Sequence, residues 1–82
     1  MKLPRDLTGK QLVKALEQMG YRVARQTGSH VRLSCEAAGP HHVTIPLHDP
    51  LRVGTLAAIL ADVAAHHKLI RGDLVLKLFG KN

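Results

Sequence analysis

The chain has one cysteine, one tyrosine, one phenylalanine and no tryptophan among its 82 residues. A lone cysteine, Cys35, cannot form an internal disulfide, which excludes disulfide-stapled miniproteins and predicts an intracellular, cytoplasmic protein. No run approaches the roughly 18 apolar residues of a membrane span, and the N-terminus lacks the apolar segment of a secretory signal, so no membrane association is expected. So few aromatic residues also argue against reading single-stranded nucleic acid by base stacking.

Positive charge is in excess and is concentrated in the first part of the chain. Twelve Lys and Arg residues face six Asp and Glu residues, which gives a net charge of +6. Residues 1–34 carry seven of the basic residues and only two of the acidic ones. The length predicts one domain, residues 1–82, and its basic balance predicts an anionic partner, most commonly nucleic acid.

Two amphipathic segments predict helices. Thr8, with Gln11 three residues later, is typical of a capping box and predicts a first helix over residues 9–19. A second apolar stripe at helical spacing predicts a helix from residue 53 or 54 to residue 66. The segment 69–79 is compatible with helix or strand, and its apolar residues either complete the core or form an exposed patch for a partner chain.

Three alternating segments, residues 21–25, 30–35 and 41–46, predict strands. The economical packing is an α+β fold of order α-β-β-β-α, with helices on one face of a three-stranded antiparallel sheet. The other face then lacks an apolar cover, while Cys35 and Tyr21 point inward. Strict alternation places these polar side chains on the uncovered face: Arg22, His30, Arg32, Ser34, His42 and Thr44.

His30 is the sharpest candidate for chemistry, because it begins a strand directly after the turn residues Gly28 and Ser29. Histidine titrates near neutrality and can accept and return a proton, and the 2′-OH of RNA supplies one. Attack of that oxygen on the adjacent phosphate cleaves RNA with positioned cations and without a metal or cofactor. The residues predicted to hold the RNA are Lys10, Lys14, Arg22, Arg25, Gly28, Ser29 and Arg32.

Other chemistry is less well supported by the spacing of the residues. Adjacent strand residues such as His41 and His42 point to opposite faces, and no Cys-x-x-Cys or His-x-x-x-His motif is present, which argues against a zinc site. Ser29 and His30 diverge in the same way and do not form a nucleophile–base pair. His66 and His67 are expected at the C-terminal end of the second helix, where the helix dipole favours cations.

Several segments together resemble the HicA toxins of bacterial toxin–antitoxin pairs over about residues 8–65. The resemblance is carried by Leu-Val-Lys-Ala-Leu at 12–16, Met-Gly-Tyr at 19–21, Arg-Gln-Thr-Gly-Ser-His at 25–30, Val-Thr-Ile-Pro at 43–46 with His48, and Val-Gly-Thr-Leu at 53–56 followed by Ile59 and Leu60. The pairs His41–His42 and His66–His67 are not features associated with this family.

The resemblance implies an α-β-β-β-α fold like that of the double-stranded-RNA-binding domain. It also implies a small metal-independent ribonuclease that cuts mRNA, with a HicB-type antitoxin protein as inhibitor. The family's functional histidine, in its Gly-Ser-His motif, falls on His30, and the histidine of its Pro-x-His stretch falls on His48, an accessory or loop-structuring position. A non-catalytic RNA-binding module and a protein–protein adaptor remain as alternatives; the adaptor predicts no salt-dependent RNA binding.

Overall fold

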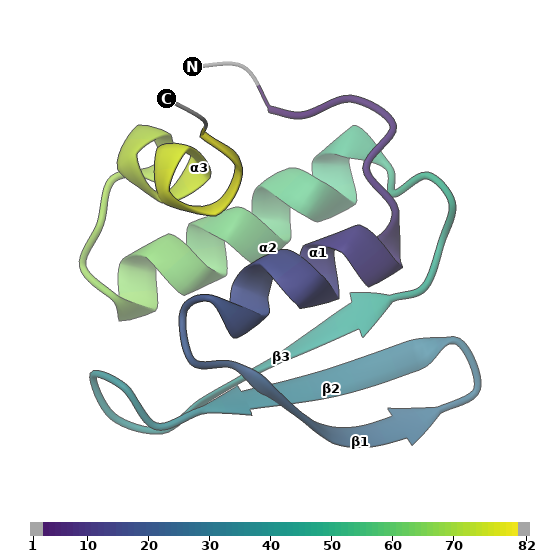
Figure 1. The fold of residues 1–82 in the computed structure, drawn as a ribbon, viewed down its shortest axis with the longest axis horizontal. Coiled ribbons are helices and arrows are strands. Elements are labelled where there is room, and N and C mark those ends of the chain that lie inside the picture. Colours follow the sequence, from purple (N-terminus) through teal and green to yellow (C-terminus); the bar gives the residue numbers. More distant parts are fainter. Residues whose placement is uncertain (1–2, 81–82) are drawn as a thin grey trace.

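Three helices lie on one side of a three-stranded antiparallel sheet in the computed structural model, which describes residues 3–80 (Figure 1). The predicted α+β class and the order α-β-β-β-α are confirmed, and a further helix follows. In chain order the elements are α1 Gly9–Glu17, β1 Arg22–Thr27, β2 His30–Cys35, β3 His41–Pro46, α2 Val53–His66 and α3 Arg71–Phe79.

The first helix begins where the capping box predicts. The Thr8 hydroxyl accepts from the Gln11 N–H at 3.1 Å, and the Gln11 side chain accepts from the Thr8 N–H at 2.9 Å. The helix ends at Glu17, two residues before the predicted end, because the N–H groups of Gln18 and Met19 bond three residues back, to the carbonyls of Ala15 and Leu16 at 3.1 and 2.9 Å. The turn that follows the helix ends at Gly20, which has a φ of +92°.

The strands pair in the order β1-β2-β3, and β2 and β3 alternate as predicted. Their inward side chains, such as Leu33 and Ile45, are fully buried beneath the helices. The first strand differs from the prediction. It spans Arg22–Thr27 instead of residues 21–25, a bulge interrupts its register between Val23 and Arg25, and all six of its residues are exposed.

The core lies between β2, β3 and the helices, and α3 closes it at the end remote from the sheet (Figure 1). The open choice for residues 69–79 is settled as helix. Leu74, Val75 and Leu78 complete the core, as one expectation for the tail had it, whereas Ile70 and Leu76 stay 69% and 56% exposed. Within residues 3–80, no single helix is long and apolar enough to span a membrane; α2 and α3 reach that composition only as a pair bent by 104°.

Candidate functional site

The uncovered face of the sheet carries the cationic side chains that the alternation of β2 predicts. In the ladder between β1 and β2, Arg22 lies opposite Ser34, Arg25 opposite Arg32, and Thr27 opposite His30. Strict alternation would place Arg25 on the helix side of the sheet. The bulge after Val23 turns Arg25 to the uncovered face, so that the three arginines share one surface.

A shallow depression of about 200 Å³ opens on this face around His30. Its lining consists of Arg25, Thr27, His30, Arg32 and Thr44, contributed by all three strands. Among these five side chains, only the imidazole of His30 is of a type that commonly serves as a general acid or base. The depression therefore places one acid–base group beside two permanent cations and two hydroxyl groups.

The turn before His30 is held by backbone bonds that fix where the strand begins. Gly28 adopts φ of +56°, a conformation that side-chain-bearing residues disfavour, and no atom crowds the space where its Cβ would lie. The carbonyl of Ser29 accepts a bond of 2.6 Å from the N–H of Leu47 in the loop after β3. The turn is thus tied to the neighbouring loop while the Ser29 side chain stays exposed.

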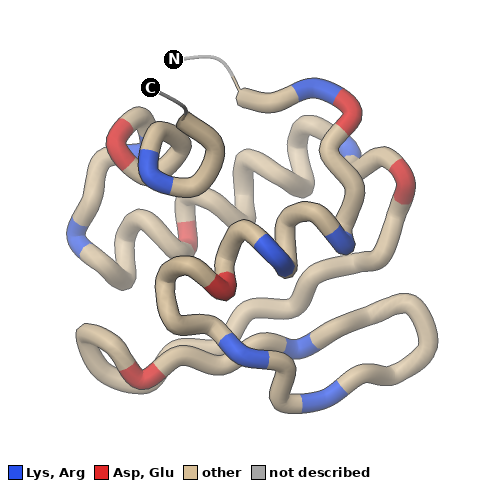
Figure 2. The backbone as a smooth tube through the Cα atoms, viewed as in Figure 1, with Lys and Arg blue, Asp and Glu red and all other residues tan. Residues whose placement is uncertain are grey.

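The remaining predicted residues lie outside the depression. Lys10 and Lys14 are exposed on α1, in the helix layer, whereas the arginines lie on β1 and β2 (Figure 2). His48 lies in the loop after β3 with an exposed side chain, and its carbonyl accepts a 2.9 Å bond from the N–H of Gly9 at the start of α1. Its backbone therefore joins the first helix to the end of the sheet that carries the turn Gly28-Ser29.

His42 occupies the other end of the uncovered face. It lies opposite Ser34, whereas His30 lies opposite Pro46, so four residues of β2 separate the two positions. That separation corresponds to about 13 Å along a strand, which is too far for both rings to act on the same phosphate.

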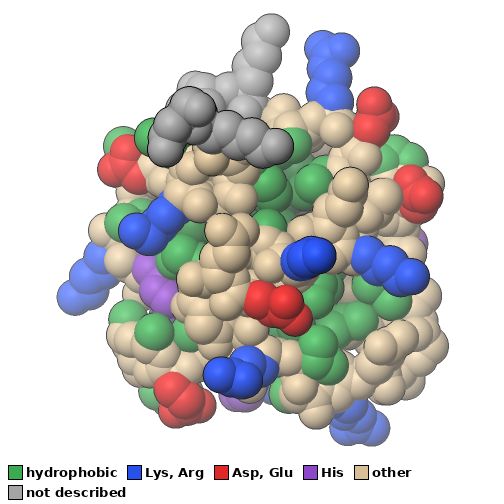
Figure 3. Space-filling model, in the orientation of Figure 1, with side chains coloured by type: hydrophobic (Ala, Val, Ile, Leu, Met, Phe, Trp, Pro, Cys, Tyr) green, Lys and Arg blue, Asp and Glu red, His purple; other side chains and the backbone are tan. Residues whose placement is uncertain are grey.

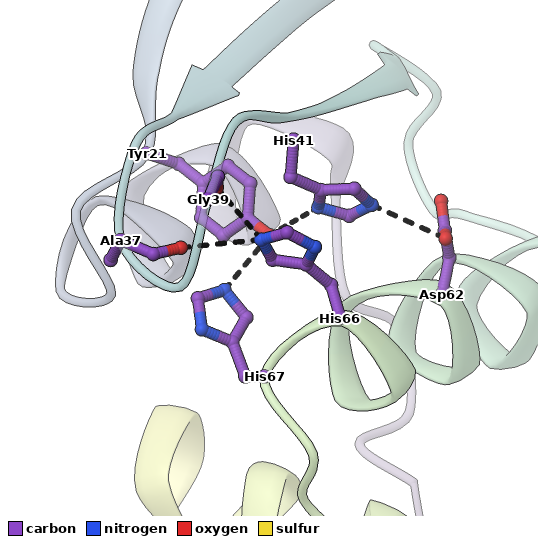
Figure 4. A network of polar contacts seen from close by, with 7 residues as sticks. All are labelled: Tyr21, Ala37, Gly39, His41, Asp62, His66 and His67. Carbon is purple, nitrogen blue, oxygen red and sulfur yellow. Dashed lines mark hydrogen bonds and ion pairs between the residues drawn. The ribbon is translucent and has the colours of Figure 1, made fainter.

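The other three histidines, His41 on β3 and His66 and His67 at the end of α2, join a separate network around Tyr21 on the helix side (Figure 4). The Tyr21 hydroxyl lies 2.6 Å from Nδ1 of His41 and 3.1 Å from Nε2 of His67. The His41 and His66 rings stack with their centroids 4.3 Å apart. At the far side of His41, its Nε2 lies 3.3 Å from the Asp62 carboxylate.

One set of ring tautomers satisfies all of these contacts: the Tyr21 hydroxyl donates to Nδ1 of His41 and accepts from Nε2–H of His67, and Nε2–H of His41 donates to Asp62. Burial, and secondarily Cys35 and Asp62, raise the pKa of Tyr21 to about 12, so its proton stays in place. Burial lowers the pKa of His67, and the neighbouring His66 and His41 lower it further.

The lowered pKa of His67 does not fit the expectation that this residue serves as a cation at the helix end. His66, in the last turn of α2, donates from Nε2 to the carbonyls of Gly39 and Ala37, at 2.9 and 3.2 Å, and so closes the turn between β2 and β3 onto α2. Within residues 3–80, no group of three or more His, Cys, Asp or Glu side chains is placed to hold a metal ion.

Two features of the uncovered face had no clear signal in the sequence. The bulge falls at Ala24, a residue type without bulge preference, and Thr27 enters the depression because β1 runs two residues beyond its predicted end. The run Arg25-Gln26-Thr27 could have indicated a longer strand, since a polar edge strand need not alternate in hydropathy.

A comparison with protein families gives one match. A family model described as "HicA toxin of bacterial toxin-antitoxin" matches residues 9–64, from the start of α1 almost to the end of α2. No curated protein and no solved structure matches the chain. The matched segment includes all three strands and therefore the whole depression around His30.

Proposed function

The chain belongs to the HicA toxin family, the toxins of bacterial toxin–antitoxin pairs, and from this premise we propose that it is a metal-independent endoribonuclease that cleaves mRNA in the cytoplasm. The observation that carries the proposal is the depression in which His30 lies beside Arg25 and Arg32. It combines an acid–base group with fixed positive charge, the two requirements for cleaving RNA through its own 2′-OH.

The reaction assigns one step to His30. Neutral imidazole takes the proton of the 2′-OH as the oxygen attacks the adjacent phosphorus, and the bond from phosphorus to the 5′-oxygen breaks. The imidazolium then returns a proton to the leaving oxygen, directly or through water. The products are a 2′,3′-cyclic phosphate and a 5′-hydroxyl, and no electron or metal is needed to balance the step.

The arginines supply charge where it develops. Arg25 and Arg32 line the depression, so that their guanidinium groups can donate to the non-bridging oxygens of the reacting phosphate. Arg22 lies further along β1, opposite Ser34, and is suited to a neighbouring phosphate of the same strand. Ser29, exposed in the turn, extends this phosphate track, with Gly28 allowing close approach of the backbone.

Lys10 and Lys14 lie in the helix layer, so they contact the part of the RNA that passes over the edge of the sheet at β1. His48 has a positioning role through the backbone of its loop. Family membership implies an antitoxin partner, and we assign that partner to the HicB type.

The chemistry is tested with the toxin stripped of its antitoxin and with EDTA present throughout. An RNA oligonucleotide should yield fragments with 2′,3′-cyclic phosphate and 5′-hydroxyl ends. The same oligonucleotide made entirely of 2′-deoxynucleotides lacks the attacking hydroxyl, so it should bind to the protein but remain intact. Cleavage of that substrate, or cleavage that EDTA abolishes, would contradict the mechanism; binding of both substrates without cleavage would favour a non-catalytic RNA-binding module.

A further inference from the structure

The helix side of β1 forms an open groove that the proposed nuclease chemistry does not use. Val23 pairs with Leu33, whose side chain is fully buried, yet Val23 itself is 52% exposed. The difference arises because the helices lie over β2 and β3 and leave β1 without a cover. Figure 3 shows apolar side chains at the surface between the basic residues of α1 and those of the sheet.

Two depressions meet at Val23 and together follow the strand. One, of about 200 Å³, is lined by Lys10, Val13, Val23, Gln26, Val31 and Leu47. The other, of about 460 Å³, is lined by Glu17, Gly20, Tyr21, Arg22 and Val23. The six residues of β1 span roughly 20 Å, the length of a short extended peptide.

The composition of the groove favours a protein segment over RNA. Its floor is aliphatic around Val13, Val23 and Leu47, and the ring of Tyr21 is buried, so no aromatic face is available for a base. Two cations border it on the side of α1: Lys10 in its lining, and Lys14 one helical turn further on the same face of the helix. Glu17 is the one acidic residue of the lining and lies at the Arg22 end.

We propose that this groove is the docking surface for the antitoxin, which fills it with an extended acidic segment. An apolar side chain of that segment covers Val23, and its carboxylates face Lys10 and Lys14. The proposal rests on the assignment of the chain as the toxin of a pair. The groove is distinct from the depression around His30, because the two surfaces lie on opposite sides of the sheet.

The proposal is tested by measuring the affinity of the toxin for its antitoxin by calorimetry. Val23→Glu places a negative charge in the groove and should weaken binding about tenfold or more, whereas Val23→Lys, of similar length and opposite charge, should weaken it much less. Leu76→Glu is the matched control: Leu76 is as exposed as Val23 but lies on α3, and the variant should bind like the wild type.

Each variant is also assayed for RNA cleavage and RNA affinity without antitoxin. Val23→Glu should retain both, so a loss of antitoxin binding is distinguishable from failure of the nuclease assignment. Equal affinities for the Val23→Glu and Leu76→Glu variants would overturn the proposal. So would equal weakening by both charges at Val23, or an effect of Val23→Glu on RNA affinity in place of antitoxin affinity.

Discussion

Arg25 lies directly opposite Arg32 in the ladder between β1 and β2, although strict alternation along β1 would place the two on opposite faces of the sheet. Two like charges facing each other across a ladder destabilise a sheet unless an anion lies between them. The bulge that turns Arg25 outward places both arginines around the depression at His30, where the proposed function needs positive charge for a phosphate.

Removing one of these charges should weaken RNA binding on all sequences alike. Arg25→Gln is expected to lower the affinity for RNA and to reduce the slope of log affinity against log salt by about 1, since one phosphate contact is lost. Filter binding over a series of salt concentrations measures both. Arg71→Gln, which removes an exposed arginine from α3, is the control and should bind like the wild type; an unchanged slope for Arg25→Gln would exclude Arg25 from the phosphate site.

A side chain at Gly9 should destabilise the fold. Gly9 begins α1 where it passes the end of β3, and a Cβ there would overlap the carbonyl oxygen of Pro46 and approach the Leu47 Cα to 2.8 Å. Because both contacts are with backbone, Gly9→Ala should lower the free energy of unfolding by about 1–3 kcal/mol, as overpacking does. Urea denaturation measures the change.

The matched variant for that measurement is Gly54→Ala in the first turn of α2, where no atom lies within 4 Å of the added Cβ. There the better helix propensity of alanine should leave stability unchanged or raise it by up to about 1 kcal/mol. Equal changes in the free energy of unfolding for Gly9→Ala and Gly54→Ala would show that α1 and the end of β3 leave room for a side chain at Gly9.

The Tyr21 network should make the fold less stable in mild acid. Burial is the main cause that lowers the pKa of His67 below its ordinary value, with His66 and His41 adding to the effect. As the pH falls below about 6.5, the unfolded chain therefore takes up a proton that the folded chain resists, and the free energy of unfolding falls. Above that pH, His67 is uncharged in both the folded and the unfolded chain, and its full contribution to the free energy of unfolding is retained.

Urea midpoints measured from pH 7.5 down to pH 5.5 test this pH dependence. His67→Gln should lower stability at neutral pH, because the bond to the Tyr21 hydroxyl changes, and should also flatten the decline toward acid. His48→Gln, which alters an exposed loop side chain, should keep the wild-type profile. Parallel declines for the wild type and His67→Gln would show that His67 is not the group responsible.

The sequence was sufficient for the parts of the fold that depend on local pattern. The capping box at Thr8 and Gln11 located the start of α1, and the alternation of β2 and β3 sorted His30 and Arg32 from Leu33 because those strands have one buried face. That one-sided burial gives a pattern with a period of two, which a single sequence displays.

The parts that could not be predicted depend on contacts between distant segments. The alternation of residues 21–25 predicted a strand, but neither face of β1 is covered, so this short pattern showed neither the bulge nor the end of the strand. The stacking of His41 on His66 joins residues 25 positions apart, whereas sequence spacing could only indicate that adjacent histidines point in different directions. The groove at Val23 is likewise a consequence of where the helices stop.

The most direct test of the account compares the wild type with His30→Ala in the same metal-free RNA digest, both freed of antitoxin, with RNA affinity measured alongside. His30 is exposed, so its replacement should leave the fold intact. The account predicts that the wild type cleaves RNA and that His30→Ala binds it with similar affinity but does not cleave. Cleavage by both proteins at equal rates would contradict the assignment of the proton transfer to His30.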